Sequence, residues 1–66
     1  MHLIVNAEPR DVPTGWTIVN LLESLALPGS RVAVEVNRIL IRRAQHGEHL
    51  LHDGDVIEIV TLVGGG

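Results

Sequence analysis

The stretch that decides the fold is Val56-Ile57-Glu58-Ile59-Val60-Thr61-Leu62-Val63, near the end of the 66-residue chain. It is the most apolar part of the sequence, because only Glu58 and Thr61 interrupt a run of aliphatic side chains. Runs of β-branched and aliphatic residues of this length favour a strand. A strand this apolar is predicted to be covered on both faces, and therefore to lie in the centre of a sheet.

Four shorter stretches before it predict the strands that join it in the sheet. Val32, Val34 and Val36 alternate with other residues, which is typical of a strand with one buried face. Strands are predicted at Met1–Asn6, Arg10–Pro13, Val32–Val36 and Ile39–Ile41, with turns at Asn6-Ala7-Glu8-Pro9, Asn37-Arg38 and Asp53-Gly54-Asp55 and a loose helical turn at Arg43–Gly47. The second strand is expected at a sheet edge, because Pro13 has no backbone donor.

One helix of about three turns at most is predicted between the second and third strands. Thr17 is the expected N-cap, because its hydroxyl can accept a hydrogen bond from an amide one turn further on. Trp16, just before the cap, is expected to pack on Leu21 as a hydrophobic staple. Pro28 is expected to end the helix, since a residue before proline avoids the helical conformation. Its buried face is predicted to contain Ile18, Leu21, Leu22 and Leu25.

Together these elements predict an α+β domain with the β-grasp fold. A central last strand that runs parallel to the first gives a mixed five-stranded sheet, which packs on one α-helix. We expect one domain over residues 1–63, because 66 residues leave no room for two, and a flexible glycine tail at residues 64–66. The predicted helix-facing core consists of Leu3, Val5, Leu21, Leu22, Leu25, Val34, Val36, Ile57 and Ile59.

The composition argues against several classes of function. Cysteine is absent, which removes disulfides, thiol nucleophiles and thiolate metal sites. The net charge of −3 and the single aromatic residue, Trp16, argue against a nucleic-acid surface. No apolar run reaches the roughly 20 residues of a membrane helix, and Met1–Asn6 lacks the basic region of a secretory signal. We therefore expect a cytoplasmic protein that binds neither nucleic acid nor membrane.

Neither a metal site nor an active site is predicted. His46, His49 and His52 recur at three-residue intervals, and neutral imidazoles can bind zinc. Gly47 and the Asp53-Gly54 turn break any helix that would align them, so we expect surface loop histidines, with zinc binding as the alternative. No carboxylate stands in a credible acid–base pair. The chain is therefore expected to catalyse nothing and to bind no cofactor.

The reactive feature of the sequence is its glycine end, Gly64-Gly65-Gly66. Three residues without side chains reach roughly 10 Å when extended and can thread a narrow channel in another protein. A terminal carboxylate is ionised at neutral pH and is a poor electrophile, so attack on it requires prior activation, for example as an acyl-adenylate. The alternative is a frayed terminus or an artificial glycine extension.

Two groups of residues are candidates for partner binding. Glu58, Val60 and Leu62 share the face of the last strand that is opposite the core, and their alternative is ordinary surface scatter. Arg42 and Arg43 cluster by the fourth strand. They either dock acidic groups of a partner or form a solvated edge that discourages strand addition.

The chain resembles the sulfur carrier proteins of the ThiS type, which serve thiazole formation in thiamin biosynthesis. The resemblance covers the whole chain. It rests on the opening strand that ends in Asn6, the capped helix from Thr17 to Leu25, the pair Val36-Asn37, Arg43 before a loose turn, Asp53-Gly54-Asp55 and the Gly65-Gly66 end. A departure is Trp16, a position that is more often polar in such carriers.

The resemblance implies a mechanism and a set of partners. An E1-like adenylyltransferase would use ATP to activate the carboxylate of Gly66. Sulfur from a persulfide-bearing donor protein would then displace AMP and leave a thiocarboxylate on Gly66, and thiazole synthase would receive that sulfur. Gly64 and Gly65 would lie in the partner's channel. Two alternatives remain open: a carrier for another pathway, such as the molybdopterin synthase small subunit, and a ubiquitin-like modifier or binding module.

Overall fold

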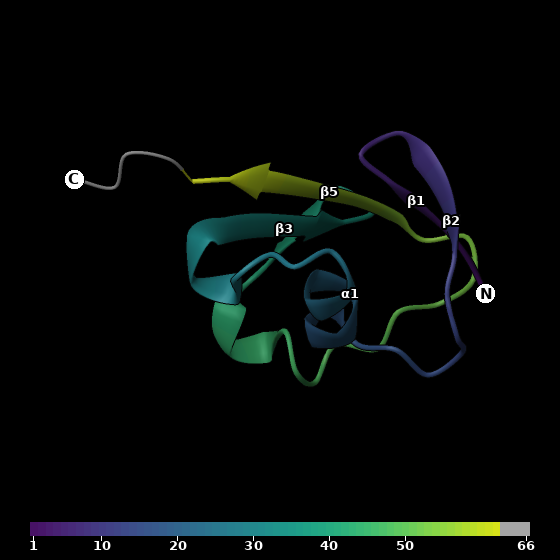
Figure 1. The fold of residues 1–66 in the computed structure, drawn as a ribbon, viewed down its shortest axis with the longest axis horizontal. Coiled ribbons are helices and arrows are strands. Elements are labelled where there is room, and N and C mark those ends of the chain that lie inside the picture. Colours follow the sequence, from purple (N-terminus) through teal and green to yellow (C-terminus); the bar gives the residue numbers. More distant parts are fainter. Residues whose placement is uncertain (63–66) are drawn as a thin grey trace.

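The computed structural model describes residues 1–62, so the predictions for Val63 and for the glycine tail, residues 64–66, lie outside the described part. Five strands form one sheet there, and a single α-helix packs on it (Figure 1). The elements are β1 (His2–Val5), β2 (Glu8–Asp11), α1 (Ile18–Ser24), η1 (Gly29–Arg31), β3 (Val32–Val36), β4 (Ile39–Ile41), η2 (Arg43–Gln45) and β5 (Val56–Thr61), where η marks a short 3-10 helix. No helix within residues 1–62 is long and apolar enough to cross a membrane.

The sheet has the order β2-β1-β5-β3-β4, which places β5 in the centre. β5 runs parallel to β1 and antiparallel to β3, so the first and last strands of the described chain are direct neighbours. The two outer pairs, β1 with β2 and β3 with β4, are antiparallel hairpins. The prediction of a β-grasp fold with a central last strand is confirmed.

The helix covers one face of the sheet and leaves the other open. Ile57 and Ile59 point into the core, whereas Val56 and Val60 are 41% and 57% exposed. The prediction that β5 is covered on both faces is therefore wrong, because the α-helix packs on one face and no other element within residues 1–62 covers the second face. Leu25, predicted in the core, is only half-buried against it. The buried core consists of Leu3, Val5, Ile18, Leu21, Leu22, Val32, Val34, Val36, Ile41, Leu51, Ile57 and Ile59.

The β1–β2 hairpin is tighter than predicted. Its turn consists of Asn6 and Ala7 alone, with φ angles of 50° and 68°. Positive φ at both central residues is the signature of a type I′ turn, whose twist matches that of the flanking strands. The return strand therefore spans Glu8–Asp11 instead of Arg10–Pro13. The proline in the edge strand is Pro9, paired in register with Ile4.

The start of α1 is as predicted, but its end is not. The Thr17 hydroxyl accepts a hydrogen bond from the Asn20 amide at 3.4 Å, and the Asn20 side chain accepts one from the Thr17 amide at 2.8 Å. This capping box satisfies two backbone donors at the helix start. Trp16 is half-buried against the core, and its packing on Leu21 stays a prediction.

The helix ends at Ser24, before Pro28 can act on it. Ala26 adopts a left-handed conformation with φ of 57° and donates to the Glu23 carbonyl at 3.0 Å. Leu27 donates to the Leu22 carbonyl at 2.9 Å, which completes a Schellman motif. The motif satisfies carbonyls that the helix end would otherwise leave free. The expected role of Pro28 as the terminator is therefore wrong.

Because a Cβ atom is unfavourable in the left-handed region, Ala26→Gly should stabilise the domain. We expect the free energy of unfolding to rise by about 0.5–1 kcal/mol, measured by urea denaturation. The matched control is Ala44→Gly in η2, which should not stabilise the domain. A loss of stability in Ala26→Gly would contradict the assignment of Ala26 to the Schellman motif.

Candidate functional site

The end of β5 is fixed by a side chain that extends the sheet. Regular pairing with β1 ends at Val5 and Ile57. Beyond it, Asn6 Oδ1 accepts a hydrogen bond from the Ile59 amide at 2.8 Å, and Asn6 Nδ2 donates to the Ile59 carbonyl at 3.2 Å. The amide side chain of Asn6 therefore takes the place of a further strand residue. On the other side of β5, the Leu62 amide donates to the Arg31 carbonyl at 2.7 Å.

The start of β5 is held by a second turn asparagine. Asn37 and Arg38 form the β3–β4 turn, again with positive φ angles, of 52° and 69°. The Asn37 amide donates to the Val56 carbonyl at 2.7 Å, and Asn37 Oδ1 accepts from the Val56 amide at 3.0 Å. Asn37 Nδ2 also reaches the buried carboxylate of Asp55, at 3.0 Å, and Asp55 accepts from the His52 amide at 2.8 Å.

The two asparagines together hold the strand from which the chain continues to Gly66. Figure 1 shows β5 running to the end of the molecule that lies away from the β1–β2 hairpin. Because both ends of β5 are bonded to the rest of the sheet, the direction in which the chain leaves the domain at Leu62 is set by the fold. Gly64, Gly65 and Gly66, the predicted tail and modification site, lie outside the described residues.

The open face of the sheet carries the first group of candidate residues. Val60 and Leu62 are 57% and 52% exposed, and Glu58 is exposed beside them. Glu58 stands directly opposite Glu35 of β3 in the register, and like charges in this position destabilise a sheet. The face also includes Leu40, which pairs with Glu35 and is 63% exposed. It is an apolar surface with two adjacent carboxylates.

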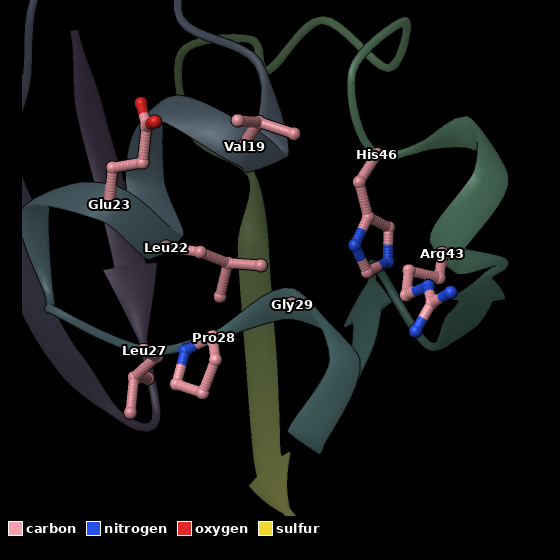
Figure 2. Close-up of a pocket in the computed structure, with 8 residues that line it drawn as sticks. All are labelled: Val19, Leu22, Glu23, Leu27, Pro28, Gly29, Arg43 and His46. Atoms are coloured by element: carbon pink, nitrogen blue, oxygen red, sulfur yellow. The ribbon is translucent and has the colours of Figure 1, made fainter.

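The arginines belong to a different part of the molecule. Arg42 and Arg43 are both exposed, at the start of η2. Arg43 lines a cavity beside α1, together with Val19 and Leu22 (Figure 2). This cavity is on the helix side of the sheet, whereas Val60 is on the open side. The structure therefore divides the predicted partner-binding residues between two surfaces.

The prediction that the three histidines are surface loop residues is wrong for His46. His52 is exposed and His49 is half-buried, but His46 is only 2% exposed. The His46 ring nitrogen Nε2 lies 3.0 Å from the Ile41 carbonyl oxygen. Because that carbonyl can only accept, Nε2 carries the proton. Within residues 1–62, no three His, Asp or Glu side chains are grouped so that they could hold a metal ion.

Sequence reasoning missed His46, Asn6 and Asn37 as organising residues. Both asparagines were recognised as turn formers, but their hydrogen bonds to β5 depend on which strands become neighbours. His46 gave no signal, because its burial depends on where the chain after β4 folds back. An asparagine at the first position of each two-residue turn was the one available clue.

The whole described domain, with the glycine end that follows it, corresponds to a known family. The sequence profile of the ThiS family matches residues 3–66. The chain belongs to the ThiS family. The resemblance identified from the sequence motifs is thereby confirmed.

Individual ThiS relatives agree with this assignment in both fold and sequence. The crystal structure of the thiamine biosynthesis protein ThiS from Geobacter metallireducens superposes with a TM-score of 0.86, at 30% identity and with full coverage of both chains. The sulfur carrier protein ThiS of Bacillus subtilis (strain 168) is 48% identical over 50 residues, which is 76% of each chain.

A longer protein contains a ThiS-like region as well. A thiazole synthase from Paramagnetospirillum magneticum (strain ATCC 700264 / AMB-1) is 35% identical over 66 residues, which cover the whole of this chain. Those residues are 20% of that protein, so the chain spans only a fifth of the length of this relative.

Asn6→Ala should destabilise the domain, because it removes both bonds to Ile59 and leaves an alanine at positive φ. Each lost hydrogen bond contributes about 0.5–1.5 kcal/mol, so we expect the free energy of unfolding to fall by about 1–3 kcal/mol in urea denaturation. Asn6→Asp is the matched control, because it keeps the acceptor for the Ile59 amide and tolerates the turn. The free energy of unfolding should fall by less in Asn6→Asp than in Asn6→Ala. Equal losses in the two variants would show that the side-chain bonds to Ile59 do not hold β5.

Proposed function

We propose that this domain is a sulfur carrier for thiazole formation in thiamin biosynthesis, and that the sulfur is carried on Gly66. The observation that carries the proposal is the match to the ThiS family, which extends through the glycine end to residue 66. Relatives over most of the chain are named sulfur carrier protein ThiS. The domain acts as a carrier and leaves catalysis to its partner enzymes.

The chemistry begins with activation of the Gly66 carboxylate. An E1-like adenylyltransferase uses ATP to convert the carboxylate to an acyl-adenylate and releases pyrophosphate. The terminal sulfur of a persulfide on a donor protein then attacks the carbonyl carbon and displaces AMP, which gives an acyl disulfide. A thiol cleaves the sulfur–sulfur bond, so that a thiocarboxylate remains on Gly66 and the thiol and the donor sulfur become a disulfide. Glycine offers the incoming nucleophile no side chain to pass.

The features of this chain suit a carrier. The absence of cysteine means that no internal thiol can capture the activated carbonyl. The bonds from Asn6 and Arg31 hold the end of β5 up to Leu62, so a partner that binds the domain meets the tail at a fixed starting point. Gly64 and Gly65 give the following segment the slender cross-section that a narrow channel requires.

The thiazole synthase relative supports the choice of acceptor. In Paramagnetospirillum magneticum, a segment similar to this whole chain is part of a protein named thiazole synthase. A carrier-like segment and a thiazole synthase within one polypeptide are brought together at high effective concentration. We therefore propose thiazole synthase as the partner that receives the sulfur from Gly66.

The proposal is tested by intact mass spectrometry of the terminus. After incubation with the adenylating partner, ATP and a persulfide donor, the full chain should exchange one terminal oxygen for sulfur. A chain without Gly66 should keep its fold but take up no sulfur, because its carboxylate retreats by about 3.5 Å from the partner's reactive centre. Gly65→Val should act similarly by blocking the channel. Sulfur uptake by the truncated chain equal to that of the full chain would contradict this function.

The open face of the sheet is the proposed docking surface for the adenylating partner. Exposed apolar residues next to the exit of the tail are the type of surface that protein partners cover. Val60→Asp should weaken the complex at least tenfold, because it adds a third carboxylate near Glu35 and Glu58 and removes apolar contact. The measurement is titration calorimetry.

The matched control is Leu50→Asp, since Leu50 is 51% exposed and pairs with Thr17 on the helix side. It should leave the affinity unchanged. Equal weakening by Val60→Asp and Leu50→Asp would place the docking surface elsewhere.

A further inference from the structure

The cavity beside α1 is separate from both the tail and the open face. It has a volume of about 310 Å³, and its walls are mainly apolar (Figure 2). Val19 and Leu22 of α1 form one wall, and Leu27, Pro28 and Gly29 form another. Small-molecule sites start at about 300 Å³, so this volume suits a single ring better than an extended ligand.

A buried histidine is among the polar residues that line this cavity. Only 2% of the surface of His46 is exposed, and its Nε2 is hydrogen-bonded to the Ile41 carbonyl. Its other ring nitrogen, Nδ1, has no hydrogen-bond partner within residues 1–62, and Figure 2 shows this edge of the ring turned toward Leu22 across the cavity. No fully buried side-chain nitrogen or oxygen of the described residues is unpaired, so Nδ1 keeps some accessible surface, and His46 lines this cavity. In the neutral imidazole with its proton on Nε2, Nδ1 is a hydrogen-bond acceptor.

Arg43 adds a charge beside the ring. It lines the same cavity, its side chain is exposed, and it forms no ion pair with any residue in the described part of the chain. In Figure 2 its guanidinium is drawn on the side of the His46 ring away from Leu22, whereas the carboxylate of Glu23 points away from both. A free guanidinium at this position favours an acidic group on whatever enters.

We propose that this cavity receives a tryptophan or tyrosine side chain of a partner protein, adjacent to an acidic residue that meets Arg43. Tryptophan and tyrosine combine a large apolar body with a single donor, which suits the apolar walls and the Nδ1 acceptor of His46. Aliphatic side chains lack the donor, and charged side chains lack the apolar body. Tryptophan and tyrosine are also the usual anchors of protein interfaces. The proposal rests on the proposed function only in that a carrier must dock on its partner enzymes.

The donor requirement is tested with small probes on the full chain. Indole should cause saturable amide shifts at Val19, Leu22 and Gly29 and a shift of the His46 Nδ1 resonance. The probe 1-methylindole has the same ring system but no donor. It should bind about two- to tenfold more weakly, the equivalent of one hydrogen bond. Equal binding of the two probes would overturn the role of His46.

The position of the site is tested by filling it. A Cβ atom at Gly29 would meet Leu22 at 3.8 Å, an ordinary contact, so Gly29→Ala should fold normally and narrow the cavity. We expect it to weaken indole binding at least fivefold. Ser30→Ala, next along the chain and exposed, is the matched control and should change nothing. Unchanged binding to Gly29→Ala would exclude this cavity.

The source of the aromatic group and the role of Arg43 are tested with tryptophan derivatives. N-acetyltryptophanamide, which imitates a residue within a polypeptide, should bind more tightly than free tryptophan; the reverse order would indicate a metabolite site and overturn a protein partner. N-acetyl-Glu-Trp-amide should bind more tightly than N-acetyl-Lys-Trp-amide, and Arg43→Gln should remove the difference. No difference in the unaltered chain would refute the acidic neighbour.

The docking role itself is tested on the complex with the adenylating enzyme and on that with thiazole synthase. Gly29→Ala should lower the affinity of at least one of the two complexes fivefold or more. Ser30→Ala should change the affinity of neither complex. If both complexes keep their affinity, the cavity does not dock either enzyme. The probe titrations need neither ATP nor a sulfur donor, so their failure is distinguishable from a failure of Gly66 to accept sulfur.

Discussion

The hydrogen bonds from two turn asparagines to the central strand hold this domain together around β5. Asn37 bonds the strand where it starts, at Val56, and Asn6 bonds it near its end, at Ile59. Each asparagine also occupies the first position of a two-residue turn at positive φ, where its side chain is one of the few that are tolerated. Each asparagine therefore closes one hairpin and attaches it to β5, the strand that lies between the two hairpins.

Much of the fold could be predicted because it follows from local patterns. The alternation of Ile57 and Ile59 with Glu58 and Val60 identified which side of β5 faces the helix, and Thr17 identified the helix start. The end of the helix could not be predicted in the same way. Pro28 is a strong termination signal, but the helix already ends at Ser24. Ala26 had already turned the backbone, and alanine carries no sequence signature of a left-handed residue.

The candidate site also contains some features that follow from local sequence patterns and others that depend on the tertiary fold. The glycine end and the apolar residues of the open face are visible in the sequence, because a run of glycines and an exposed apolar alternation are local features. The separation of Arg43 from Val60 is not visible in the sequence, since it depends on the chain passing from β4 across to the helix side. The burial of His46 arises from the same crossing, because the ring packs under α1 only once η2 has brought it there. Tertiary placement therefore converts two apparently similar surface clusters into two distinct surfaces.

The central position of β5 has a consequence for synthesis. Ribosomes deliver the chain from its N-terminus, and β1 and β3 both need β5 as their neighbour. Neither hairpin can join a complete sheet until residue 61 has emerged, so folding waits for β5 and is dominated by contacts distant in sequence. A prematurely terminated chain without β5 loses the strand that links the two halves, and with it a folded surface for partners.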